Sequence, residues 1–209
     1  MAEETEIQDA APAAPVDETL EALRVLAGVD DAQRLLGEVV LRCTADAAHQ
    51  LLTMLRDKFA FQQVMELCGV DYPERAARFE VVYNLLSVTK NQRVRVILTT
   101  DATAPIASVS DIWPAAGWWE REVWDLFGIS FAGLIDHRRI LTDYGFEGHP
   151  LRKDFPLTGF LEVHYDEDRH AVVYDKVKLT QEFRNFDFLS PWEGMTTLPG
   201  DEKVDRSGS

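Results

Sequence analysis

Residues 79–100 read FEVVYNLLSVTKNQRVRVILTT and contain the clearest strand pattern in the chain. Phe79 to Val88 is rich in β-branched and aromatic side chains, which favour strands. In Arg93 to Thr100 apolar side chains alternate with Arg and Thr, as expected of a strand with one buried face. Thr89 to Gln92 lies between them and has an ordinary length for a hairpin loop. The stretch therefore predicts an antiparallel hairpin.

Weaker patterns on both sides of this hairpin extend the prediction. Glu38 to Arg42 has the composition of a strand, and the spacing of leucines predicts a helix from Ala45 to about Phe59. Phe61 to Cys68 is mostly apolar and is predicted to be a short strand or an extended segment. A short helix is predicted from Ala104 to Ile112, because Pro105 suits a first helical turn. We predict an α+β fold, with an antiparallel or mixed sheet packed against helices.

Composition divides the chain into three parts. Residues 1–30 are rich in Ala, Pro and acidic side chains, and are predicted to be a disordered tail because they contain too little apolar surface to fold alone. Residues 31–130 would form the α+β domain. Residues 131–209 are predicted to be an extended, loop-rich segment that binds a partner, within which 160–165 and 171–175 can pair as a hairpin.

Trp118 to Phe127 is predicted to be an amphipathic helix with a carboxylate on its apolar face. On a helical wheel of about 100° per residue, Glu120 falls inside the apolar arc. A buried carboxylate is costly unless a cation or several backbone donors compensate it. We predict that Arg138 or Arg139, which follow this helix in the sequence, forms an ion pair with Glu120. The alternative is that Glu120 is exposed to solvent.

The same wheel assigns the other charged side chains of this helix to its polar face. Arg121, Glu122 and Asp125 fall there, and Arg121 and Asp125 are spaced for an i, i+4 ion pair. Trp124 and Phe127 fall on the apolar face. Four of the five tryptophans lie between residues 113 and 124, a density that suits a core corner or a protein interface.

Charge and cysteine content exclude several classes of protein. The chain has 209 residues and a net charge of −15, which argues against a nucleic-acid partner because phosphates require a basic face. No apolar run approaches the roughly 20 residues of a membrane span. Cys43 and Cys68 are too few to hold an iron–sulfur cluster, which usually needs four cysteines. We expect a cytoplasmic protein without a secretory or mitochondrial signal.

The sequence contains no recognisable catalytic motif. Dinucleotide, Walker, HExxH and GxSxG patterns are all missing. His137, Asp143, His149 and Asp154 could be imagined as metal ligands, but their spacing matches no common zinc pattern. We therefore predict no catalytic, cofactor or metal site, and interpret the charged loop 148–154 as structural or as a polar docking surface.

Large aromatic side chains are spaced through the polar C-terminal stretch. Either they fold back on their own domain or they lie across a partner as anchors, the interpretation we favour. These side chains are Phe183, Phe186, Phe188 and Trp192.

Several motifs, taken in order, carry a resemblance to a known family. They are Glu120-Arg121-Glu122, Trp124-Asp125-Leu126-Phe127-Gly128-Ile129, Arg138-Arg139-Ile140-Leu141 and Gly148-His149-Pro150-Leu151-Arg152-Lys153-Asp154-Phe155-Pro156-Leu157. Together they resemble the family of the C subunit of proton-translocating NADH:quinone oxidoreductase (respiratory complex I), whose mitochondrial counterpart is the iron–sulfur protein 3 subunit. The resemblance spans roughly residues 35–193. It departs at Leu134, where relatives commonly have the histidine of a His-Pro-Asp-Leu sequence.

The resemblance implies a non-catalytic scaffold subunit in the peripheral arm of that complex. It implies contacts with the subunit that lines the quinone pocket and with cluster-bearing subunits, on the cytoplasmic side of the bacterial inner membrane. FMN and the iron–sulfur clusters would belong to other subunits, and this chain would hold no cofactor. Two alternatives remain: the equivalent subunit of a membrane-bound hydrogenase or another donor-driven complex, and a free-standing metal hydrolase that uses the loop from His137 to Asp154.

Overall fold

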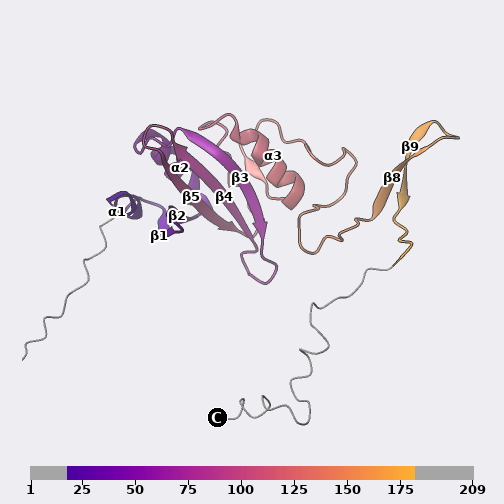
Figure 1. Cartoon of the computed structure of the whole chain (residues 1–209), viewed down its shortest axis with the longest axis horizontal. Helices are drawn as coiled ribbons and strands as arrows, with labels where there is room; N and C mark the ends of the chain where they lie inside the picture. Colours follow the sequence, from indigo (N-terminus) through magenta and orange to yellow (C-terminus); the bar gives the residue numbers. More distant parts are fainter. Residues whose placement is uncertain (1–17, 182–209) are drawn as a thin grey trace, which may run out of the picture. The chain divides into compact units, whose positions relative to one another are not determined.

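Five strands form the main sheet, in the order β1-β2-β5-β4-β3 (Figure 1). The computed structural model describes residues 18–181. Its elements are α1 Glu18–Arg24, β1 Val29–Leu35, β2 Glu38–Thr44, α2 Ala45–Asp57, β3 Gln63–Asp71, β4 Phe79–Ser87, β5 Gln92–Thr100, β6 Ile106–Ala107, α3 Ala116–Phe127, β7 Phe131–Ala132, β8 Leu161–Asp166 and β9 Ala171–Lys176.

The predicted hairpin lies in the middle of this sheet. β4 and β5 pair antiparallel from Phe79 opposite Thr100 to Ser87 opposite Gln92. β5 also pairs with β2, and this pairing is parallel. The remaining pairs in the main sheet are antiparallel, so the sheet is mixed and the predicted α+β class is confirmed.

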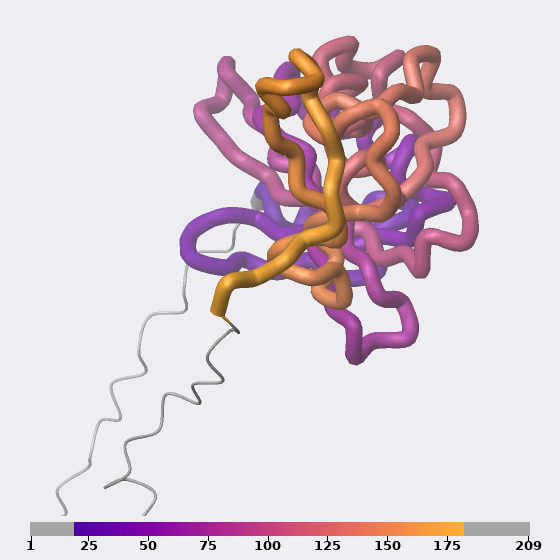
Figure 2. Tube along the Cα trace, turned by 90° about the vertical axis from the view of Figure 1, so that its right-hand side faces the viewer, coloured from indigo at the N-terminus to yellow at the C-terminus, as the bar shows by residue number. Residues whose placement is uncertain are grey.

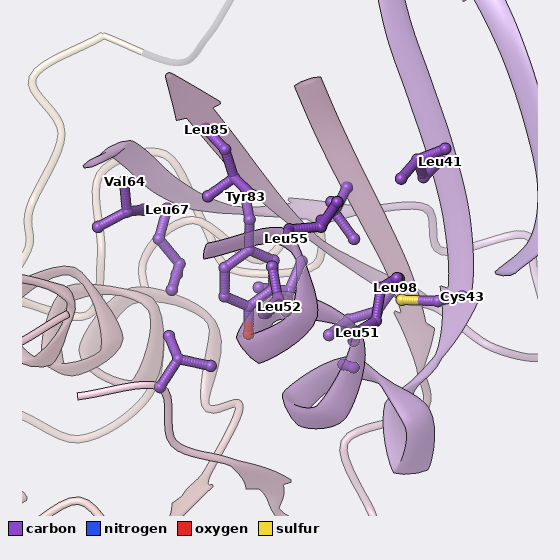
Figure 3. Close-up of a cluster of buried hydrophobic side chains, with 14 of the residues drawn as sticks. Leu41, Cys43, Leu51, Leu52, Leu55, Val64, Leu67, Tyr83, Leu85 and Leu98 are labelled. Atoms are coloured by element: carbon purple, nitrogen blue, oxygen red, sulfur yellow. The ribbon is translucent and has the colours of Figure 1, made fainter. Parts of the chain in front are cut away.

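The helix α2 covers one face of the sheet through a stripe of leucines. Leu51, Leu52 and Leu55 are fully buried, as their i, i+1, i+4 spacing predicts. Figure 3 shows Leu52 beside the ring of Tyr83, a side chain of β4, and all three leucines belong to the same buried cluster. Thr44 occupies the N-cap position of α2, but its side chain makes no capping hydrogen bond.

Part of the expected N-terminal tail is ordered. α1 and the start of β1 lie within residues 18–30, and Leu23 in α1 is fully buried in the core. These elements were not predicted because β1 reads VDDAQRL, and six of its seven side chains are exposed or half-buried. An edge strand of this kind lacks the alternating apolar pattern by which strands are recognised.

The helix predicted from Ala104 to Ile112 does not form. Instead, β6 pairs in parallel with β7, placing Ile106 opposite Phe131, and turns follow up to Trp113. A proline suits a first helical turn but does not create one. Here the Val109 backbone N–H bonds to a side chain of α3.

The described residues fall into two compact units, divided between Gly159 and Phe160. Residues 131–159 therefore lie with the first unit rather than with the extended C-terminal segment that we predicted. In the second unit, β8 and β9 form the predicted antiparallel hairpin, with Leu161 opposite Lys176 and Asp166 opposite Ala171. The two strands run alongside each other in Figure 2.

Candidate functional site

The helix α3 contacts β3 and carries three buried charged side chains. Glu120 and Asp125 are 0% exposed and Arg121 is 8% exposed. Gly69 on β3 permits this close packing, because an added Cβ would lie 2.8 Å from the ring of Phe127. Buried charges on this scale require partners, and the partners define the site.

Glu120 is buried, as predicted, but its partners are not arginines. Its Oε2 accepts a hydrogen bond from Ser108 Oγ at 2.6 Å, and its Oε1 accepts one from the backbone N–H of Val109 at 2.7 Å. The prediction of an ion pair with Arg138 or Arg139 is therefore wrong. The donors come from the turn after β6, a segment that we expected to be helical. Burial raises the pKa of Glu120, and these two hydrogen bonds oppose the rise only in part.

Asp125 holds the loop that follows β7. Its Oδ1 accepts hydrogen bonds from Arg139 Nη1, at 2.7 Å, and from the Thr142 hydroxyl. Its Oδ2 accepts three backbone N–H groups, from Ile140 at 3.0 Å, Leu141 at 2.8 Å and Thr142 at 2.9 Å. Burial opposes the charged form of Asp125, but these hydrogen bonds outweigh it and lower the pKa of the carboxyl.

Arg121 holds the same loop from the other side. Its Nε donates to the carbonyl of Arg138 at 3.0 Å, and its Nη2 donates to that of Arg139 at 3.1 Å. Its Nη1 lies 3.3 Å from Asp136, which also accepts a 2.6 Å hydrogen bond from Arg138. The predicted placement of Arg121 and Asp125 on a polar face, paired with each other, is wrong, since both are buried and bind the loop instead.

The C-terminal end of α3 is capped by the loop that contains residues 148–154. Gly128 ends the helix with a left-handed φ of 77°. His149 Nδ1 donates to the carbonyl of Asp125 at 2.9 Å, and Arg152 Nε donates to that of Phe127 at 2.6 Å. A cation at this end also interacts favourably with the helix dipole. These contacts favour the structural interpretation of the loop 148–154, and its interpretation as a docking surface stays a prediction.

The same loop is tied to the sheet through Asp71 and Arg78. Asp71, whose side chain is 0% exposed, accepts hydrogen bonds from Arg78 Nε at 2.6 Å and from the Lys153 backbone N–H at 2.7 Å. Arg78 also contacts Asp154 at 3.0 Å. The Arg78 hydrogen bond lowers the pKa of Asp71. We did not single out Arg78 from the sequence, because it lies at the start of a strand with no charge pattern to mark it.

Comparison with known proteins shows the family to which this chain belongs. Residues 41–161 match the family model described as "Respiratory-chain NADH dehydrogenase, 30 Kd subunit". The chain belongs to this family. The C subunit of the NADH-quinone oxidoreductase of Erythrobacter litoralis is 60% identical over 81% of this chain and 68% of that protein. The corresponding protein of Rhizobium johnstonii is 56% identical over 82% of this chain and 88% of its own length.

A solved structure from an archaeal complex has the same fold. A chain in the structure of the membrane-bound sulfane sulfur reductase, an archaeal respiratory membrane complex, matches with a TM-score of 0.58 and 28% identity, over 67% of this chain and 85% of that chain. Members of the NADH dehydrogenase 30 Kd family are thus subunits of an oxidoreductase complex, and other subunits are their partners. No helix within residues 18–181 has the length and apolar character needed to span a membrane.

The family match covers most of the predicted site. It includes α3 and every contact described above between Asp71 and Asp154. Trp124 is half-buried, and its ring centroid lies 4.2 Å from that of His137. Glu122 is half-buried and lines a surface groove between α3 and β3. The predicted anchors Phe183, Phe186, Phe188 and Trp192 lie outside the described residues.

The side chains imagined as metal ligands are separately engaged. His149 contacts a helix carbonyl, Asp154 contacts Arg78, and His137 packs on Trp124. Within residues 18–181 no three His, Cys, Asp or Glu side chains are grouped as a metal site would require. The contacts found for the loop do not favour the metal hydrolase alternative.

Proposed function

We propose that this chain is a non-catalytic scaffold subunit in the peripheral arm of a proton-translocating NADH:quinone oxidoreductase. It would pack against the quinone-pocket subunit and cluster-bearing subunits on the cytoplasmic side of a bacterial inner membrane. FMN and iron–sulfur clusters would be held by those other subunits. Family membership supports the complex, and the use of the α3 charges to hold loops supports a structural role for them.

One observation carries the proposal that the chain docks through its second unit. One face of the β8–β9 hairpin carries Lys176 at its end and is otherwise apolar. Its five apolar side chains are each 53–59% exposed: Leu161, Val163, Tyr165, Val172 and Tyr174. The opposite face carries Glu162, His164 and Asp175. An isolated two-stranded hairpin is marginally stable in water. An apolar face of this kind is therefore typical of a surface that a partner covers.

Neighbouring valines on β9 provide a matched test of docking. Val172 lies on the apolar face and Val173 on the opposite one. We expect Val172→Lys to reduce the co-purification of the other subunits with this chain, because a partner would have to bury the added ammonium group. Val173→Lys should leave it nearly unchanged. Equal co-purification for both variants, with subunits identified by mass spectrometry, would contradict docking through this face.

A second candidate is the equivalent subunit of a complex with another electron donor. The likeness to a chain of the sulfane sulfur reductase favours it, whereas the higher identity to subunits named for NADH and quinone favours the first. NADH-driven quinone reduction by the complex purified through this chain would support the first candidate. A complex without that activity, encoded beside genes for a different donor, would support the second.

A further inference from the structure

A chain of hydrogen bonds connects the buried carboxyl of Glu120 with a surface cleft. Ser108 Oγ lies 2.6 Å from Glu120 Oε2 and 2.7 Å from Ser110 Oγ. Both serines line a cleft of about 410 Å³, together with His49 and Asp111. Ser108 is buried and Ser110 is half-buried, so of the two hydroxyl groups beside the fully buried carboxyl, that of Ser110 is the more accessible to solvent.

The direction of these hydrogen bonds follows from the number of available hydrogens. An ionised carboxylate only accepts, so the single hydroxyl hydrogen of Ser108 is used on Glu120. In the bond between the two serines, Ser110 must then be the donor. The Ser110 backbone N–H also donates to Ser108 Oγ, at 3.2 Å. Every hydroxyl donor in this series of hydrogen bonds therefore points inward, from the cleft to Glu120.

The groups that face Glu120 leave its charge poorly compensated. Asp111, in the cleft, raises the pKa of Glu120, whereas His49 on α2 lowers it, and both effects are weaker than the effect of burial. Tyr83 faces it from β4, and burial together with the charge of Glu120 raises the pKa of the phenol. Behind Tyr83, burial raises the pKa of the Cys43 thiol on β2 to about 12. Tyr83 and Cys43 thus stay neutral and cannot offset a carboxylate.

We propose that Glu120 is a proton-binding site, loaded from the cleft through Ser110 and Ser108. A proton from solvent adds to Ser110 Oγ, the hydrogen of Ser110 passes to Ser108 Oγ, and that of Ser108 passes to Glu120 Oε2. The carboxylate becomes a carboxylic acid, both serines remain neutral, and no other reactant is consumed.

Proton uptake changes what the cleft presents to solvent. The carboxylic acid of Glu120 donates to Ser108, which turns its own hydrogen toward Ser110. The hydroxyl hydrogen of Ser110 is then released to point into the cleft. While Glu120 is charged, the Ser110 hydroxyl offers the cleft only an acceptor. When Glu120 is neutral, the same hydroxyl offers a donor. The protonation state of Glu120 therefore determines which hydrogen bond a ligand in the cleft can make with Ser110.

The equilibrium part of the proposal is tested by unfolding the full chain at a series of pH values. The folded pKa of Glu120 is raised above its ordinary 4.5. The stability that the neutral acid contributes is therefore complete below pH 4.5 and is lost as pH rises through the folded pKa. Glu120→Gln, which imitates the neutral acid, should remove this loss. A free-energy difference between the two proteins that is constant with pH would overturn the proposal.

The pathway is tested by a rapid pH jump followed through tryptophan fluorescence, because Trp118 and Trp119 precede Glu120 on α3 and contribute to the signal. The relaxation due to proton binding at Glu120 is the one that is missing in Glu120→Gln. Its rate should fall about tenfold or more in Ser110→Ala, which corresponds to a barrier that is roughly 1.4 kcal/mol higher. Ser110→Thr, which keeps a hydroxyl, should restore the rate. Ser130→Ala, beside β7, is the control. An unchanged rate in Ser110→Ala would overturn the relay. Ser110→Ala keeps both hydrogen bonds of Glu120, those with Ser108 and Val109, so it remains a test even where Glu120→Gln does not fold.

Discussion

Arg139 Nη1 and Asp125 Oδ1 lie 2.7 Å apart across 14 positions of the sequence, and neither group is free to act elsewhere. The carboxylate also accepts hydrogen bonds from the backbone N–H groups of the three residues that follow this arginine. A pair that could be mistaken for catalytic charges therefore stabilises a loop. The family's charged motif residues act, in this chain, mainly on backbone atoms.

Asp125→Asn is expected to be the most destabilising conservative change on α3. Asn has one acceptor oxygen, which can serve either the three backbone N–H groups or Arg139 and Thr142, and its NH₂ group would face donors on the other side. Arg139 also loses its charged partner. We expect a loss of about 3 kcal/mol in the free energy of unfolding, measured by urea denaturation. Glu147→Gln, on an exposed side chain of the same region, is the control and should change the free energy little. A loss as small as that of the control would contradict the role assigned to Asp125.

Sequence patterns found the elements whose apolar side chains repeat regularly. The β4–β5 hairpin, the leucine stripe of α2 and the helix ended by Gly128 were predicted, because each buries a regular face. β1 was not predicted, since its side chains are mostly exposed. Residues 104–112 were predicted wrongly, because the proline was weighed without knowledge of the pairing between β6 and β7.

The same limit explains the errors within the site. A helical wheel correctly placed Glu120 on the buried side, but it describes one helix in isolation. Arg121 and Asp125 are buried by a loop that packs on the face opposite the sheet, and no periodicity in the helix records that loop. Arg78 was missed because its partners lie in segments that only the fold brings together.

Two glycines with left-handed φ allow the cost of backbone strain to be measured apart from the cost of steric crowding. A Cβ at Gly128 (φ +77°) would collide with Arg152 Nη2 and lie 2.6 Å from His149 Nε2, whereas at Gly133 (φ +87°) nothing lies within 4 Å. We expect Gly133→Ala to cost about 1 kcal/mol through backbone strain alone. Gly128→Ala should cost more, since the two capping side chains must also move. Equal losses in thermal unfolding would show that the capping contacts contribute little.

The free energy of unfolding should depend on pH in the acid range, because of Asp71. Its folded pKa is lowered below the ordinary 3.8, chiefly by the hydrogen bond from Arg78. The stability that this pair contributes is therefore present above pH 3.8 and is lost as pH falls through the folded pKa. Asp71→Asn should be less stable than the wild type at pH 6, and the difference should narrow on acidification. A difference that stays constant down to pH 3 would contradict the prediction.

Removal of the aromatic anchors in the C-terminal stretch should weaken assembly without unfolding the first unit. Phe186→Ala together with Trp192→Ala deletes two large apolar side chains beyond the described residues. Truncating an interface anchor often costs about 2 kcal/mol or more in binding, roughly a thirtyfold change in affinity. We expect reduced co-purification of the other subunits with an unchanged near-UV circular dichroism spectrum. Tyr144→Ala, which removes an aromatic side chain that is 84% exposed, is the matched control. Retained assembly in the double variant would favour the alternative that these aromatic side chains fold back on their own domain.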